Sequence, residues 1–186
     1  KMYNFCEVKD MLLAVDCGNT QVVLGVFDQD KLLASWRIST NARRTADEYM
    51  VFLKDFLNSK GISFDDIHGM IVGSVVPAVN DALYKLAESH LHCPPPLFVD
   101  YQTGIKLMVD NPAEVGADRI IDALAAHKKY GGPLIIVDFG TATTLDCVSA
   151  AGEYIGGAIC PGVEISRDAL FAHAAKLSSI ALTKPP

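Results

Sequence analysis

Two stretches of this sequence decide its fold: Leu12–Thr20, which reads LLAVDCGNT, and Leu134–Ala142, which reads LIIVDFGTA. Each begins with the apolar pattern of a buried strand. An Asp-x-Gly step, small hydroxyl or amide residues and a second apolar run follow. The copies start 122 residues apart. This spacing predicts one supersecondary unit used twice, each copy a hairpin with a polar turn.

These polar turns have the composition of phosphate-binding turns. Glycine lets the backbone come close to a bound group, and backbone N–H groups and threonine hydroxyls can donate to phosphate oxygens. The aspartate at the end of the strand can hold a cation or its water. In a single copy, an ordinary hairpin with a turn-stabilising aspartate is the better explanation of the pattern. Two copies with hydroxyl residues favour a polyphosphate held between two domains.

The remaining patterns predict a mixed α/β layer. Further strands are expected at 22–27, 32–38, 69–75, 97–99, 143–149 and 153–159, and helices at about 46–59, 77–90, 115–130 and 163–175. Thr45-Ala46-Asp47-Glu48 has the form of a capping box. We predict an extension at 1–10, a first domain at 11–115, and a connecting helix with the beginning of a second domain at 116–186.

Charge and cysteine content narrow the class of protein. The net charge of −6 and the pI of about 5.2 make nucleic acid a poor partner. The apolar run Met11–Phe27 is interrupted by polar and glycine residues, so it predicts neither a signal peptide nor a membrane span. The five cysteines show no Cys-x-x-Cys spacing. We therefore expect reduced thiols and a cytoplasmic location.

Several motifs occur in one order along the chain. They are Asp16-Cys17-Gly18-Asn19-Thr20, Ser74-Val75-Val76-Pro77, Asn111-Pro112 with Glu114–Arg119, Asp138–Thr144, Gly156–Ile159 with Pro161-Gly162, and Ala175-Lys176-Leu177. From about Met11 to its end the chain resembles the type III pantothenate kinases of the actin/hexokinase/Hsp70 superfamily. The resemblance implies an α/β fold of duplicated actin-like (ribonuclease H-like) domains with mixed five-stranded sheets, the second incomplete in this chain.

The resemblance also implies a reaction and its participants. The expected reaction is the ATP-dependent phosphorylation of pantothenate to 4'-phosphopantothenate, the first step of coenzyme A biosynthesis. The expected cofactors are ATP, Mg²⁺, and K⁺ or NH₄⁺, and the expected assembly is a homodimer. The implied ATP and phosphate residues are Asp16, Cys17, Gly18, Asn19, Thr20, Gln21, Val22, Val23 and Thr141. The pantothenate residues are Tyr101, Gly116, Ala117, Asp118 and Arg119. Asp118 is the implied catalytic base, Asp16 lies near Mg²⁺, and Asp138 binds the monovalent cation.

These residue types suit phosphoryl transfer. A carboxylate beside the acceptor alcohol, the role implied for Asp118, orients the hydroxyl and takes its proton. Arg119 can hold the carboxylate of pantothenate in bidentate fashion. Structural alternatives remain: Asp118 and Arg119 can form an ion pair at a helix start, and Tyr101 can be a core residue with a satisfied hydroxyl.

Other readings remain open. One alternative is a non-catalytic nucleotide-binding regulatory protein of the same fold, and another is a sugar or acetate kinase of the superfamily. His90-Leu91-His92-Cys93 contains zinc-ligand residue types, but no second ligand cluster accompanies it, so we predict no zinc site. The family usually continues beyond Lys184-Pro185. If the protein ends at Pro186, we expect weak or absent kinase activity and an exposed apolar edge on the second domain.

Overall fold

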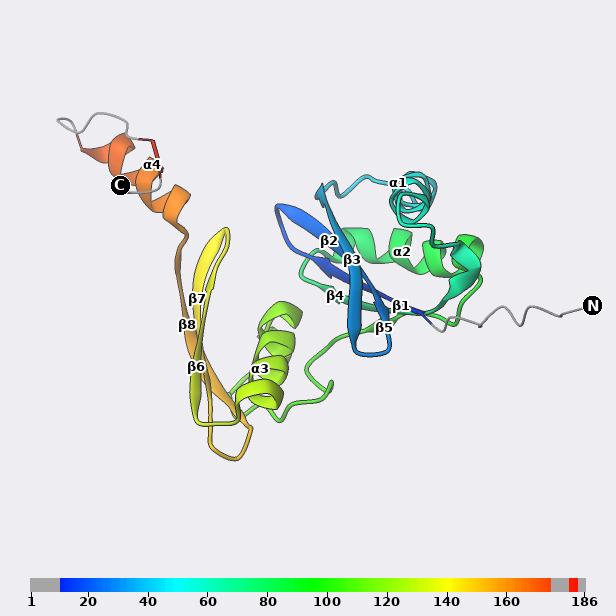
Figure 1. The fold of residues 1–186 in the computed structure, drawn as a ribbon. Helices are drawn as coiled ribbons and strands as arrows, with labels where there is room; N and C mark the ends of the chain where they lie inside the picture. Colours follow the sequence, from blue (N-terminus) through cyan, green and yellow to red (C-terminus); the bar gives the residue numbers. More distant parts are fainter. Residues whose placement is uncertain (1–10, 175–180, 184–186) are drawn as a thin grey trace, which may run out of the picture. The chain divides into compact units, whose positions relative to one another are not determined.

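The structure is a computed structural model that describes residues 11–174 and 181–183. The predicted extension at 1–10 and the Ala175–Leu177 motif lie outside these residues. The described chain divides into two compact units (Figure 1). The first unit consists of the described residues within Lys1–Ile105 and Asp110–Asp122. The second unit consists of the described residues within Lys106–Val109 and Ala123–Pro186. The division therefore falls inside one helix, α3 (Ala117–Tyr130).

The first unit contains a five-stranded mixed sheet in the order β3-β2-β1-β4-β5. Its strands are β1 (Met11–Cys17), β2 (Gln21–Asp28), β3 (Lys31–Ser39), β4 (Ile67–Ser74) and β5 (Leu97–Phe98). β1, β2 and β3 form an antiparallel meander, whereas β4 runs parallel to both β1 and β5. The mixed sheet predicted from the resemblance is confirmed. The carboxyl ends of β1, β4 and β5 consequently share one edge of the sheet.

Two helices, α1 (Ala46–Asn58) and α2 (Pro77–Leu86), lie on the same side of this sheet (Figure 1). Their buried side chains are Tyr49, Leu53, Leu57, Val79, Leu83 and Leu86. They pack against apolar residues at every second position of the strands. This alternation is typical of a sheet that is covered on one face. Fully burying one such side chain stabilises the folded state by about 1.5–3 kcal/mol relative to leaving it exposed to water. The predicted capping box is confirmed: Glu48 N donates to Thr45 Oγ1, and Thr45 N donates to Glu48 Oε2 at 2.8 Å.

Short irregular helices account for the differences from the predicted helix bounds. The helix predicted to run to about residue 90 leaves α-geometry after Leu86 and continues as a π-helix, η2 (Ala87–Leu91). Two 3₁₀ segments, η1 (Phe64–Asp66) and η3 (Pro112–Glu114), precede β4 and α3. α3 begins at Ala117, because the 3₁₀ turn with Pro112 ends in extended backbone at Val115.

The second unit repeats the antiparallel meander. Its strands are β6 (Leu134–Phe139), β7 (Ala142–Val148) and β8 (Tyr154–Pro161), followed by α4 (Val163–His173). Within the described residues this sheet contains three strands. β1 pairs with β2, and β6 pairs with β7, as antiparallel hairpins. The internal repeat predicted from the sequence is therefore confirmed as two hairpins, each followed by a third antiparallel strand.

The prediction that Leu134–Val137 is a buried strand is wrong. Ile135 is 67% exposed and Phe139 is 73% exposed. These residues occupy alternate positions of β6 and point to the same face of the strand. The opposite face is buried at Asp146, whose carboxylate accepts hydrogen bonds from Tyr154 at 2.7 Å and Thr144 at 3.3 Å. Apolar composition predicted the strand correctly, but whether a face is covered depends on the rest of the fold.

No helix in the described part of the chain combines the length and the apolar character needed to cross a membrane.

Candidate active site

The first polar turn joins β1 to β2 and is braced by the end of β3. Gly18 N donates to Gln21 O at 3.0 Å, which closes the turn. Thr40 Oγ1 donates to Gly18 O at 2.7 Å, and Thr40 N donates to Thr20 O at 3.0 Å. Thr40 could not be predicted as part of this turn, because its contact with the turn depends on the pairing of β3 with β2. The hydrogen bonds fix the shape of the turn, and the side chains of Asp16, Asn19 and Thr20 remain exposed.

Two of the predicted phosphate-binding residues have buried side chains. Cys17 is 1% exposed and Val22 is fully buried, and both belong to the core cluster of the first unit. Only their backbone groups are therefore available to a ligand. Their side chains anchor the two ends of the turn in the core.

Burial also controls the chemistry of the Cys17 thiol. Desolvation raises the pKa of Cys17, the nearby charge of Asp16 raises it further, and a hydrogen bond with Ser74 acts in the opposite direction. A raised pKa leaves less thiolate at neutral pH, and thiolate is the reactive form. Cys17 is accordingly not a candidate nucleophile.

A labelling experiment checks whether the Cys17 thiol is unreactive in the folded chain. Iodoacetamide at pH 8 is expected to modify the exposed Cys160 at least about tenfold faster than Cys17, because Cys17 is both inaccessible and protonated. Peptide mapping by mass spectrometry measures both rates in the same sample. Unfolding in urea should bring the two rates together, which controls for local sequence. Equal rates in the folded chain would show that the turn opens readily.

The carboxyl-end edge of the sheet also carries the residues that follow β4 and β5. Val75 N donates to Cys17 O at 3.0 Å, and this bond ties the end of β4 to the end of β1. Val99 N donates to Val72 O at 2.8 Å, so the chain leaves β5 at the same edge. Tyr101 lies in the turn that follows and is 44% exposed. The alternative that Tyr101 is a core residue is therefore wrong.

Gly116 and Asp118 adjoin this edge. A Cβ atom added to Gly116 would lie 3.4 Å from Val75 Cγ1 and 2.5 Å from Asp118 Oδ1. A side chain at position 116 would thus displace the Asp118 carboxylate. Asp118 Oδ1 also accepts a hydrogen bond from Arg119 N at 2.8 Å. Because the other oxygen, Oδ2, is not engaged by this bond and the side chain is exposed, it is available to a substrate.

The register of the sheet shows that Asp16 and Asp118 occupy the same face. Asp16 pairs with Gly73 across β1 and β4, and register partners project to the same side of a sheet. Over Gly73 lies Ile121 of α3, which would touch any side chain placed there. Asp118 precedes Ile121 by one helical turn. Both aspartates therefore lie on one face of the first sheet, at the edge formed by its parallel strands.

The second polar turn lies in the second unit and joins β6 to β7. Gly140 N donates to Ala142 O at 2.9 Å, and Gly162 N donates to Thr141 O at 3.2 Å. A Cβ atom at Gly162 would collide with the carbonyl oxygens of Gly140 and Thr141, so only glycine fits there. The predicted residues Asp138 and Thr141 share this turn. The Pro161-Gly162 motif was visible in the sequence, but its support of the turn was not.

The arrangement of carboxylates in the described residues limits how Mg²⁺ could be held. No group of three or more His, Cys, Asp or Glu residues within residues 11–174 and 181–183 is arranged to hold a metal. Mg²⁺ commonly keeps several waters and binds through one or two carboxylates together with substrate phosphates. A single exposed carboxylate beside a glycine turn, as Asp16 provides, fits that mode of binding.

Comparison of the fold with solved structures gives the class of protein. The ethanolamine utilization protein EutJ from Carboxydothermus hydrogenoformans superimposes with a TM-score of 0.52 at 13% identity, covering 91% of this chain and 58% of that one. The chain thus has the duplicated actin-like fold. Residues 12–186 match the sequence model of the family described as type III pantothenate kinase. A curated type III pantothenate kinase of Moorella thermoacetica (strain ATCC 39073 / JCM 9320) is 46% identical over 177 residues, which cover 95% of this chain and 70% of that protein. The chain belongs to the type III pantothenate kinase family.

Proposed function

We propose that this chain transfers the γ-phosphoryl group of ATP to the hydroxyl group of pantothenate, giving 4'-phosphopantothenate and ADP. Family membership and the name of the curated relative support the substrates. The observation that carries the proposal is the placement of Asp16 and Asp118 on one face and at one edge of the first sheet. Asp16 adjoins the glycine turn, which can bind phosphate. Asp118 adjoins the start of α3, where the pantothenate hydroxyl can bind.

In the proposed reaction Asp118 acts on the acceptor. Its Oδ2 accepts the proton of the pantothenate hydroxyl, while Arg119 N holds Oδ1 and fixes the orientation of the carboxylate. The hydroxyl oxygen forms a bond to the γ-phosphorus as the bond from that phosphorus to the bridging oxygen of ADP breaks. Backbone N–H groups of Asn19 and Thr20 in the first turn stabilise the negative charge on the phosphate oxygens, since Gly18 N already donates to Gln21 O. Most of the rate enhancement then comes from positioning and charge stabilisation.

The other members of the site have supporting parts in this proposal. Arg119 holds the carboxylate of pantothenate, and Tyr101 also contacts pantothenate. Asp16 would help to hold Mg²⁺, which would supply positive charge beside the phosphates. Asp138 binds K⁺ or NH₄⁺, and Thr141 contacts ATP. The homodimer and the cytoplasmic location are proposals that rest on the resemblance and on the cysteine pattern.

An assay of ADP release across three acceptors tests the function. Pantothenate is expected to support Mg²⁺-dependent ADP release that K⁺ or NH₄⁺ increases, and glucose and acetate are not. ATP binding without turnover on any acceptor would favour the non-catalytic regulatory alternative. Preference for glucose or acetate would favour another kinase of the superfamily.

A further inference from the structure

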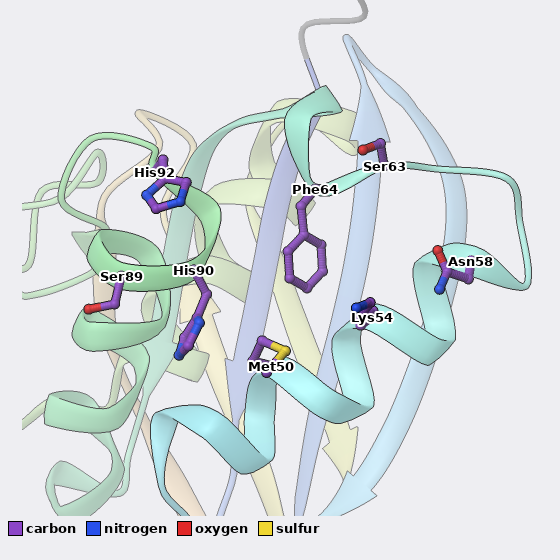
Figure 2. A pocket seen from close by; sticks show the side chains of 8 residues that line it. All are labelled: Met50, Lys54, Asn58, Ser63, Phe64, Ser89, His90 and His92. Carbon is purple, nitrogen blue, oxygen red and sulfur yellow. The ribbon is translucent and has the colours of Figure 1, made fainter.

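A pocket of about 310 Å³ opens on the first unit (Figure 2). None of its lining residues belongs to the candidate active site. It is lined by residues of α1, of η1 and its N-cap, and of η2 and its C-cap: Met50, Lys54, Asn58, Ser63, Phe64, Ser89, His90 and His92. The three α1 residues recur every four positions and therefore share one face of that helix. The volume lies at the lower end of the range for small-molecule sites.

The lining combines an apolar floor with a rim of donors. Figure 2 shows the ring of Phe64 in the centre, with Met50 beneath it and the polar side chains around them. Ser63, Ser89 and Asn58 can each donate a hydrogen bond. Lys54 supplies a positive charge, and no described residue pairs with it in an ion pair. No carboxylate is among the lining residues, although Asp47 contacts His90 and Asp66 Oδ2 accepts a hydrogen bond from Ser63 N. The charge of Lys54 therefore favours an anion on its own side of the pocket.

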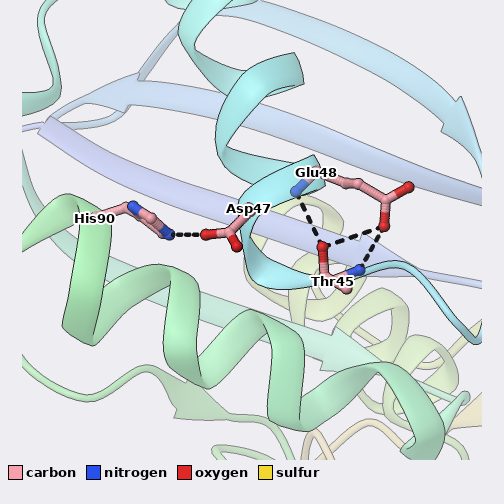
Figure 3. Close-up of polar contacts among 4 residues, drawn as sticks. All are labelled: Thr45, Asp47, Glu48 and His90. Carbon is pink, nitrogen blue, oxygen red and sulfur yellow. Dashed lines mark hydrogen bonds and ion pairs between the residues drawn. The ribbon is translucent and has the colours of Figure 1, made fainter.

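The two histidines are held in place by the local backbone and by one contact. His90 Nε2 lies 3.0 Å from Asp47 Oδ1, and this contact fixes the ring along the pocket wall (Figure 3). His92 has φ 53°, in the left-handed region, directly after the π-helical turn. Both π-helical turns and left-handed non-glycine residues concentrate at ligand sites. Here they turn the His92 side chain back to the rim instead of continuing the helix.

We propose that this pocket binds a small organic anion. Its phosphate or carboxylate group lies against Lys54, which supplies the positive charge, and its apolar body lies on Phe64 and Met50. The site would work independently of phosphoryl transfer, since it shares no residue with the candidate active site.

Titration of the full 186-residue chain with phenyl phosphate, followed by ¹H–¹⁵N NMR, tests the proposal. Amide shifts are expected at Lys54, Ser63 and His92. The variant Lys54→Met keeps most of the apolar stem but loses the charge, and it should weaken binding about tenfold or more. Lys60→Met is the matched control, because Lys60 follows the same helix but does not line the pocket. It should bind as the parent chain does.

Further probes separate the contributions of charge and apolar body. Benzoate should also bind, whereas phenol and inorganic phosphate should each bind more weakly, because each lacks one half of the expected ligand. The proposal is overturned if phenol binds as well as phenyl phosphate, or if Lys54→Met leaves the affinity unchanged. It is also overturned if the shifts are confined to the Gly18–Gln21 turn, since phenyl phosphate would then be reporting the phosphate site of the kinase alone.

Discussion

Replacing Asp118 by asparagine is expected to lower kcat for pantothenate phosphorylation by about 10²–10⁴-fold. The substitution keeps the size and planarity of the side chain. Its amide oxygen can still accept from Arg119 N, so the orientation seen in the structure is retained. What is lost is the capacity of the second oxygen to take the proton of the acceptor hydroxyl. The effect should therefore fall on kcat more than on the KM for ATP.

Single-turnover ADP release measures this effect directly. Because Asp118 is exposed, the melting temperature of the variant should stay within about 2 °C of the parent. Asp81→Asn provides a control, since it removes another exposed carboxylate, on α2 and outside the candidate site. The base assignment would be wrong if Asp118→Asn retained the parental kcat, or if both variants lost activity to the same extent.

The hairpins and helix caps could be predicted because they depend on short stretches of sequence. Alternating apolar residues, an Asp-x-Gly turn and a Thr-x-x-Glu box each specify a local backbone conformation through nearby contacts. The structure confirms both hairpins with their Asp-x-Gly turns, at residues 11–28 and 134–148, and the capping box of Thr45 and Glu48. The resemblance then supplied the arrangement of strands that local patterns leave open.

The parts that could not be predicted depend on contacts between distant residues. The packing of Ile121 over Gly73 places Asp118 on the face of Asp16, yet neither residue carries a local sign of the other. Thr40 braces Gly18 across 22 positions of sequence. The exposure of Ile135 and Phe139 is another such case, because an apolar strand has the same sequence pattern whether or not another layer covers it. The pocket beside Phe64 likewise needed three separated segments to meet.

Replacing Asp16 by asparagine is expected to reduce kcat/KM about 100-fold or more and to raise the Mg²⁺ concentration needed for half-maximal activity. The carboxylate stands exposed at the end of β1 beside the Gly18 turn, so its charge is available to a metal's water shell. Asparagine preserves a hydrogen-bonding side chain but removes that charge. A Mg²⁺ titration of turnover at fixed ATP measures the shift.

The two aspartate variants should differ in the Mg²⁺ concentration needed for half-maximal activity, and this difference tests whether the two residues have separate roles. Asp118→Asn should lose rate at every Mg²⁺ concentration with an unchanged half-saturation point, because the proton acceptor does not touch the metal. Asp16→Asn should recover part of its rate at high Mg²⁺, because mass action offsets the weaker binding. If the half-saturation point of Asp16→Asn matched the parent, Asp16 would not serve the metal, and its charge at the turn would have to act on the phosphates or on the fold instead.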